Sequence, residues 1–586
     1  MRPFFLAGML LAAGVQAELL EETPRLASLV RGGNAYLSLR DAIAIALENS
    51  LDLELQRLGP RIAETDVKRT QAGGAPRGTV LSVREGPKSV SAGADALAQA
   101  PGLGPEASLS IAGQMQVSAG RLPPLFDPVF NAKIRREHLT APQVNSFIAG
   151  TVGLITDAST ANFAVQKGFL SGAEVSIGFD NAHQTSNHRR YDLTPFNTSS
   201  FSVTFSQPLL RGFGRALNSR FIRIAANSRI QSELVFRQQV ISTVSAVIRL
   251  YWDLVILNED VKVRRQALER AEKLLADNQI QVEVGTRAPI EVIRARAEVA
   301  RSRRDLIAAE GLVRQQETVL KDFLTRRTIT DSSLAGVRII PTDPLRVERE
   351  QRTPPASELA QSAVERRPDL AQARIQVEST KLALRGSKDA LRPALDIVAS
   401  ARNNALAGSV NPLTLAGAPA HNPDPIIVGG YGTALSQLFR RNFPDYGVGV
   451  QLTIPVRNRV AQADYARDNL ALRQQEIRLR QLNKQVHVEI ENARIALEQA
   501  QAAVEAAQRE REFQEAALAA EEEKLAVGAS TTFLVIQYQR DLAQARSAEA
   551  AAQGAYVKAK AALDRAAGVL LDSYGIKIEG VSVSTP

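Results

Sequence analysis

Cysteine is absent from this chain of 586 residues, and aromatic residues account for only 5% of it, with a single tryptophan. Without thiols the chain cannot form disulfide bonds, bind a metal through thiolates, use a cysteine nucleophile or carry a lipid on an N-terminal cysteine. No Ser/His/Asp or paired-carboxylate arrangement stands out, and the histidines lack metal-ligand spacing. We therefore expect no enzyme activity, no cofactor and no metal site. The five histidines are His138, His183, His188, His421 and His487.

A dense basic segment is also missing. The formal net charge of +9 arises from 71 Lys and Arg against 62 Asp and Glu, spread along a long chain. No block of Lys and Arg with interleaved aromatic residues occurs, so we expect no nucleic-acid partner.

The one long apolar run lies at the N-terminus. Arg2 precedes "FFLAGMLLAAG", and the small residues of "VQA" end at Ala17. Charge, apolar core and small residue predict a secretory signal peptide over residues 1–17. No later segment has eighteen consecutive apolar residues. The mature protein is therefore expected either to be soluble outside the cytoplasm or to cross a membrane as a β-barrel.

Helical periodicity dominates the rest of the chain. A first pattern follows Ser38 and Asp41, which have capping-box spacing, and a break is expected near Asn49 to Asp52. Longer patterns run over about 215–283 and 459–524, and apolar seams on the second suit packing against two neighbours. Each long pattern ends at a glycine, Gly285 or Gly528, before a shorter helix returns over about 290–325 or 533–567.

Strict alternation of apolar and polar residues predicts short strands. The candidates lie at 130–135, 174–180 and 201–206 in the first half, and at 395–398 and 446–454 in the second. Residues 73–122, rich in Gly, Ala, Ser and Pro without periodicity, are predicted to be a flexible insertion.

The two halves match each other, which predicts an internal two-fold repeat. Pro208 corresponds to Pro455 and Gly285 to Gly528, and the two intervals differ by four residues, about one helical turn. A helix of about 70 residues is roughly 105 Å long, too long for a compact domain. Each half must cross its strands an even number of times, so we expect two strands from each half and leave 173–181 out. Four strands cannot close a barrel, so several chains must pool their strands.

These residues resemble the outer-membrane efflux proteins, the TolC-like outer-membrane factors. The motifs that carry the resemblance are "LRDAIAIALENSLDL", "LFDPVF", "QPLLRGFGR", the two "VG" turns, "ERRPDLAQARI" and "YGVGVQLTIPV". The resemblance implies a mixed α and transmembrane β fold. A homotrimer with four strands per protomer would form a 12-stranded β-barrel in outer-membrane lipid, continued by a long periplasmic α-helical barrel.

The same resemblance implies a function and its partners. The protein would be the exit duct of a tripartite efflux or type I secretion system, served by a periplasmic adaptor and an inner-membrane pump. A periplasmic helical-hairpin adaptor or scaffold is the alternative, but it would need only one hairpin and no strands.

The resemblance also assigns candidate sites. The turns between long and short helices would dock the adaptor, and two nearby carboxylates are gate candidates. The docking residues are Val284, Gly285, Thr286, Val527, Gly528, Ala529 and Ser530, and the gate candidates are Asp277 and Glu291.

A glycine turn between strand and helix in "QPLLRGFGRALN" could suggest a phosphate loop. However, Leu217 replaces the third glycine of GxGxxG, and the matching stretch "IPVRNRVAQADY" keeps the proline but neither glycine. We therefore expect strand-to-helix joints, built on Pro208, Gly212, Gly214 and Pro455.

The chain is accordingly predicted to divide into segments whose borders follow these signals. They are 1–17 (signal peptide), 18–72 (first helix), 73–122 (insertion), 123–210 (strands), 211–327 (long helix, tip and return helix), 328–356 (linker), 357–391 (first helix of the second half), 392–456 (strands), 457–568 (long helix, tip and return helix) and 569–586 (C-terminal tail).

Overall fold

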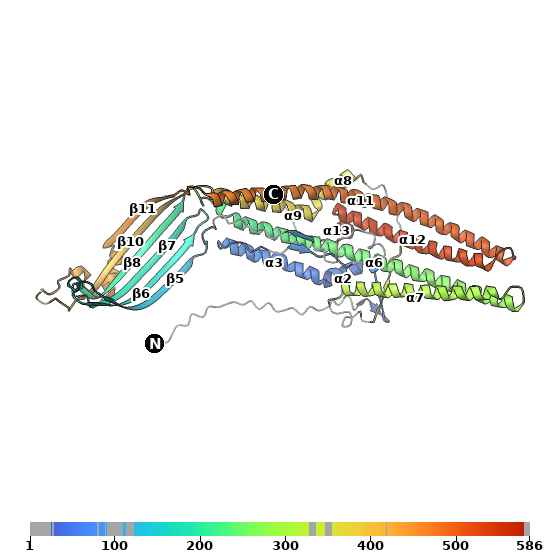
Figure 1. Cartoon of the computed structure of the whole chain (residues 1–586), viewed down its shortest axis with the longest axis horizontal. Coiled ribbons are helices and arrows are strands. Elements are labelled where there is room, and N and C mark those ends of the chain that lie inside the picture. Colours follow the sequence, from blue (N-terminus) through green and yellow to red (C-terminus); the bar gives the residue numbers. More distant parts are fainter. Residues whose placement is uncertain are drawn as a thin grey trace.

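Six strands form a sheet at one end of an elongated molecule, and helices extend away from it (Figure 1). The computed structural model describes residues 25, 28–78, 81–87, 89–90, 109–112, 122–326, 334, 336–345, 354–415, 417 and 419–578. The predicted signal peptide, 1–17, lies outside the described residues, as do residues 91–108 and 113–121 of the predicted insertion.

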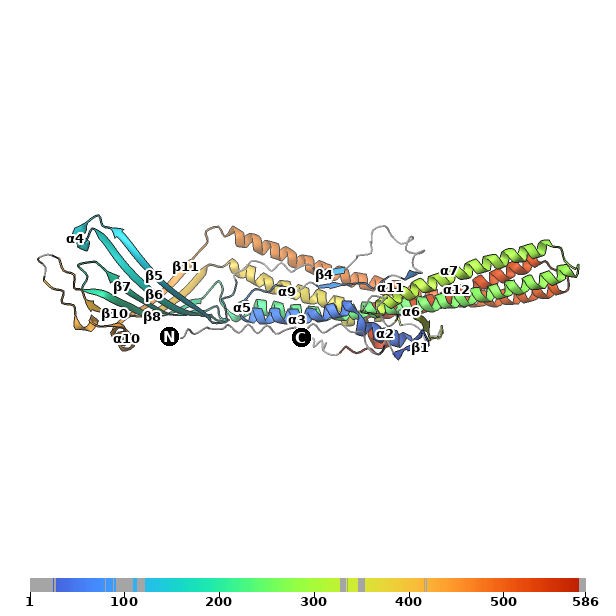
Figure 2. The same cartoon turned by 90° about the horizontal axis from the view of Figure 1, so that it is seen from below.

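Two long helices form the body of the molecule. α6 (Arg220–Glu283) has 64 residues and α11 (Arg459–Ala526) has 68, so each is about 100 Å long. α7 (Ile290–Leu324) and α12 (Thr532–Ala567) return beside them, and the hairpins end together, far from the sheet (Figure 2). The predicted long and returning helices are thus confirmed.

Shorter helices lie along the half of the body nearer the sheet. α2 (Leu39–Asn49) and α3 (Leu51–Gln71) pack on α6, while α8 (Ala356–Arg366) and α9 (Pro368–Ala390) pack on α11. The Ser38 hydroxyl accepts from the Asp41 N–H at 3.1 Å, which confirms the predicted cap, and extended Ser50 separates α2 from α3 at the predicted break.

The main core lies where α2, α6, α7 and α12 meet a small sheet of β1 (Val30–Arg31), β2 (Asn34–Leu37) and β9 (Arg338–Pro341). Tyr251 is fully buried there, and its hydroxyl donates to Asp343 Oδ2 at 2.7 Å. An 18-residue stretch of α6 is apolar enough to span a membrane, but 78% of it is buried, as expected of a core helix.

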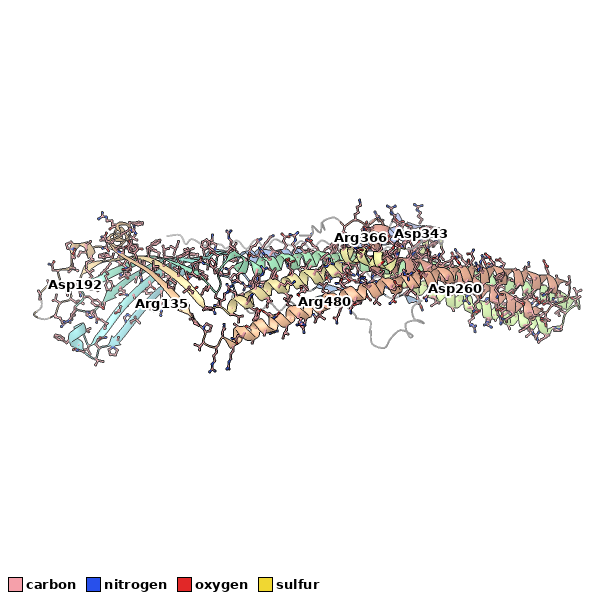
Figure 3. The ribbon with its side chains drawn as sticks, turned by 90° about the horizontal axis from the view of Figure 1, so that it is seen from above. Arg135, Asp192, Asp260, Asp343, Arg366 and Arg480 are labelled. Carbon is pink, nitrogen blue, oxygen red and sulfur yellow. The ribbon has the colours of Figure 1, made fainter. Side chains whose placement is uncertain are left out.

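The two hairpins contact each other through α12 and α6. Gly554 allows the close approach, because a Cβ at this position would overlap the side chain of Ile256. Asp260, labelled in Figure 3, accepts a hydrogen bond from the Ser547 hydroxyl of α12 at 2.6 Å.

The large sheet corrects the predicted strand count. Its order is β11-β10-β8-β7-β6-β5, all antiparallel, so each chain supplies six strands rather than four. The segment left out at 173–181 belongs to β7, between β6 and β8, and β6 was not predicted. The even number of crossings holds, but four come from the first half and two from the second. The strands are β5 (Val129–Pro142), β6 (Gly153–Gly168), β7 (Glu174–Ser186), β8 (Leu193–Pro208), β10 (Ala394–Val410) and β11 (Phe443–Thr453).

Short elements complete the described chain. They are β3 (Leu81–Val83), β4 (Leu109–Ala112), α4 (Ser146–Ala149), α5 (Arg215–Asn218), η2 (Pro425–Ile427), α10 (Tyr431–Arg440) and α13 (Leu570–Ser573).

Within the predicted insertion, residues 81–87 and 89–90 pack against the helical body. The Arg84 N–H donates to Gln239 Oε1 at 2.8 Å, and the Gln239 amide donates back to the Arg84 carbonyl at 3.0 Å. Farther along, the Ser89 hydroxyl donates to Gln316 Oε1 at 3.0 Å. Buried glutamines with fixed backbone partners hold this segment in place.

Candidate functional site

The two helix hairpins end in turns of the same geometry. Gly285 (φ 79°) and Gly528 (φ 80°) both adopt the left-handed conformation. The next residue donates its N–H back to the last turn of the helix, Thr286 to the Gln281 carbonyl at 2.9 Å and Ala529 to the Lys524 carbonyl at 2.8 Å. This pattern satisfies the helix ends and requires positive φ at the glycine.

Apolar side chains are exposed around these turns. Val284 is 72% exposed and Val527 80%. Neighbouring positions on both hairpins are also apolar and exposed, although sequence analysis did not single them out: Ile280, Ile290, Ile293, Phe533 and Leu534. The sequence does contain a signal for these positions, because apolar residues there interrupt the polar faces at the ends of the helices. An exposed apolar patch of this kind is typical of a docking surface.

The two gate candidates are not part of one site. Asp277 lines a cleft of about 550 Å³ between the hairpins, together with Arg270, Lys273, Glu515 and Glu522. Glu291 is not among its lining residues and pairs with Arg294 on its own helix at 3.0 Å. The cleft is therefore lined by both acidic and basic side chains.

Two arginines, not singled out from sequence, link one hairpin to the other. Arg287 donates to Asn278 Oδ1 at 3.1 Å and to the Thr532 hydroxyl of α12. Arg540 of α12 donates to both carboxylate oxygens of Glu298 on α7 at 3.0 Å. The hydrogen bond to Glu298 raises the pKa of Arg540, so the link stays charged. Such pairings depend on tertiary contacts between residues more than 200 positions apart, which no local pattern reveals.

The joint between the sheet and the helices in the first half contains two glycines in the left-handed conformation. Gly212 (φ 88°) and Gly214 (φ 106°) follow Pro208, the last residue of β8. The Gly212 N–H donates to Asp389 Oδ2 at 2.7 Å, so the amide that a phosphate loop would use already binds a carboxylate.

The second joint uses asparagine in place of glycine. Pro455 follows β11, and Asn458 then adopts a positive φ of 34° while its side chain donates to the Ala390 carbonyl at 3.2 Å. Asparagine is one of the few residues that tolerate this conformation. Both joints thus need a left-handed residue, although only the first uses glycine.

The two faces of the large sheet differ in polarity. The strand register places one set of alternating residues on a shared face, with apolar side chains along every strand. Representatives, one per strand, are Ile134, Val165, Phe179, Phe201, Ile397 and Val450. The opposite face carries mainly small or polar residues, such as Asn131, Asn162, Asp180, Ser202, Asp396 and Gln451. We refer to these as the apolar face and the polar face.

The sheet is open at both edges in the single chain. β5 and β11 each pair on one side only, and every residue of β11 is exposed. Arg135 lies on the sheet and Asp192 at its end away from the helices, as Figure 3 shows. Within the described residues, no cluster of three or more His, Asp or Glu side chains could hold a metal ion.

Solved structures share this fold at low sequence identity. The CmeC outer membrane channel of Campylobacter jejuni is 13% identical, with a TM-score of 0.56 over 91% of this chain and 86% of that one. VceC of Vibrio cholerae is 12% identical, with a TM-score of 0.55 over 90% and 96%. The open state of the MtrE outer membrane channel of Neisseria gonorrhoeae is 14% identical, with a TM-score of 0.53 over 91% and 89%.

Comparison with curated protein sequences gives no match. The family model described as "Outer membrane efflux protein" matches residues 174–325 and 359–569, which is more than half of the chain and includes both hairpins and their joints. The chain therefore belongs to the outer membrane efflux protein family.

Proposed function

We propose that three copies of this chain form an outer-membrane exit duct, which conducts cargo delivered by an inner-membrane pump and a periplasmic adaptor. The single observation that carries the proposal is a six-stranded sheet with one apolar face and two unpaired edges, continued by helices about 100 Å long. The family consists of transport channels rather than enzymes.

The unpaired edges support assembly from several copies. In lipid, each unpaired backbone N–H or C=O costs several kcal/mol, so a membrane sheet must close. Six antiparallel strands place β5 and β11 in opposite directions. The β11 edge of one copy can therefore pair antiparallel with the β5 edge of the next.

Helix α11 supports the same assembly. Besides the face that packs on α9 and α12, it exposes a second apolar stripe with helical spacing: Leu470, Ile477, Val488 and Ile495. A long helix that exposes such a stripe needs a further neighbour. An adjacent copy would supply it and extend the bundle into a helical barrel.

The proposed barrel is wider than the twelve strands that the family resemblance implies. Six strands from each of three copies give eighteen. With strands about 4.8 Å apart and tilted by about 40°, the barrel would measure roughly 36 Å across, against about 24 Å for twelve strands. Its lumen would be lined by the polar face, and lipid would contact the apolar face.

Membrane fractionation tests the proposal. We expect the full chain to partition with outer membranes and to migrate as a heat-sensitive, SDS-resistant trimer. Recovery as a soluble periplasmic monomer would contradict the proposal and favour the adaptor alternative.

Substitution of the tip glycines is expected to weaken adaptor docking. Proline fixes φ near −65° and removes an N–H, whereas Gly285 has φ 79° and donates to the Val282 carbonyl at 3.0 Å. Gly285→Pro should therefore distort the first tip and reduce co-purification with the co-expressed adaptor by about tenfold, equivalent to ~1.4 kcal/mol. Trimer yield should not change.

Gly285→Asn is the matched control, because asparagine tolerates positive φ. It should retain adaptor binding close to that of the unmodified protein. Equal adaptor recovery with the proline and asparagine variants would show that the tip geometry does not matter for docking.

A further inference from the structure

The amphipathic helix α10 lies on the apolar face of the sheet, at the end away from the long helices (Figure 2). Ala434 and Leu438 are buried against Ala405 and Ala407 of β10. The Gln437 side chain both accepts from the Leu406 N–H and donates to the Leu406 carbonyl, each at 3.0 Å. These bonds fix the helix on the strand.

Near this helix the apolar face also carries polar side chains. Along neighbouring strands, Ala401 and Phe201 are followed two residues further out by Asn403 and Ser199. The Tyr431 hydroxyl, at the start of α10, donates to Asn181 Oδ1 at 3.0 Å. If the sheet spans the outer membrane as proposed above, α10 lies at the outer boundary between hydrocarbon and water, where aromatic residues with a polar end are favoured.

A cleft of about 460 Å³ separates part of α10 from the strands. Its apolar lining includes Phe179, Phe201, Val203, Leu435 and Phe439, and Phe439 is 86% exposed. The cleft is large enough for a small organic ligand. Because the cleft lies on the face that would contact lipid, the acyl chains of the membrane are the apolar ligand available to it.

Two arginines, Arg440 and Arg441, lie at the C-terminal end of α10. Arg441 lines the cleft and donates to the Tyr446 hydroxyl at 3.0 Å, while Arg440 is exposed beside it. Both arginines are exposed, so their guanidinium groups can reach a ligand at the mouth of the cleft. An acyl chain gains little by moving from bilayer to cleft, so selectivity must come from the headgroup. Guanidinium groups favour phosphate, which they bind with paired hydrogen bonds.

We propose that the cleft under α10 binds a phosphorylated lipid of the outer leaflet, with one acyl chain against Phe179 and Phe201 and a phosphate on Arg440 and Arg441. This inference rests on the proposed membrane location. The bound lipid would seal α10 to the sheet, next to the edge strand β11 through which copies are proposed to pair.

Native mass spectrometry of the detergent-solubilised full-length assembly tests the inference, with diphosphorylated lipid A as the probe and phosphatidylcholine as the comparison. The test variant is Arg440→Gln with Arg441→Asn, because Arg441 has φ 56° and asparagine tolerates this conformation. Arg301→Ala, an exposed arginine on α7, is the matched control.

We expect the unmodified trimer and the Arg301→Ala trimer to retain lipid A, and the double variant to retain it about tenfold less, equivalent to ~1.4 kcal/mol. Lipid A should raise the melting temperature of the first two only. Equal retention by the double variant, equal retention of phosphatidylcholine, or a trimer that binds no lipid would each overturn the inference while leaving the proposed function intact. Absence of a trimer would instead contradict the proposed function.

Discussion

Replacing Val450 with lysine is expected to destabilise the assembled barrel by about 2–4 kcal/mol, because a charged side chain on the lipid-facing side of a membrane strand costs this much near the midplane. Val450 lies on the apolar face of β11, opposite Ile397 of β10. The same substitution at the next residue, Gln451→Lys, places the charge on the polar face and should cost little.

The two lysine variants test the lipid-facing assignment directly, because both positions are exposed to solvent in the single chain. Val450 is 66% exposed and Gln451 is also exposed when no membrane or second copy is present. Only burial of the apolar face in lipid separates them. The measurement is the fraction of SDS-resistant trimer in isolated outer membranes. Equal trimer fractions for the two lysine variants would contradict the assignment of the apolar face to lipid.

Replacing Lys558 with methionine is expected to lower the stability of the helical body by about 3 kcal/mol. Lys558 of α12 donates to Asp253 Oδ1 of α6 at 2.7 Å, and the Asp253 side chain is only 3% exposed. Removal of one partner leaves a buried charge without compensation, which costs about 3–5 kcal/mol. We take the lower end, because Arg249 also lies near enough to interact with Asp253.

Two controls separate this ion pair from a general effect of charge removal. Arg303 of α7 pairs with Glu272 of α6 at 3.2 Å, but both side chains are about half exposed or more. Arg303→Met should therefore cost no more than about 1 kcal/mol. Adding Asp253→Asn to Lys558→Met should recover much of the loss. Thermal unfolding in detergent at matched protein concentrations measures the stability of all three variants. Equal losses of stability for Lys558→Met and Arg303→Met would refute the prediction.

The helices could be predicted from sequence because their signals are local. Apolar spacing located α6 and α11, and the recurring Val-Gly dipeptide located two turns that require positive φ. The Ser38 cap follows from residues three positions apart. Each of these signals depends on neighbouring residues alone.

The strands were harder to predict, for two reasons. β6 lacks strict alternation, because Asp157 and Ser159 lie on the apolar face while Leu154, Ala158 and Ala164 lie on the polar face. β7 was excluded by assuming equal strand numbers in the two halves, which no physical rule requires. Each half still crosses an even number of times, with four strands in the first half and two in the second.

Long-range contacts account for the remaining differences. The packing of residues 81–87 and 89–90 depends on Gln239 and Gln316, which lie far away in sequence. The position of Asn458 in a left-handed turn could have been anticipated, because asparagine is a known substitute for glycine there. The bridge between Arg287 and Thr532 could not, because it needs the two hairpins side by side.

Cysteine cross-linking in isolated outer membranes tests most directly whether copies close through β5 and β11. The chain has no cysteine of its own, so only introduced thiols can react. Ile134→Cys on β5 is combined in turn with cysteine at Tyr446, Val448, Val450 and Leu452, which share its face on β11. We expect at least one pair to form disulfide-linked dimers and trimers but no larger species, and Gln451→Cys, on the opposite face, to cross-link less. Monomers alone throughout the series, or a ladder beyond three chains, would contradict this expectation.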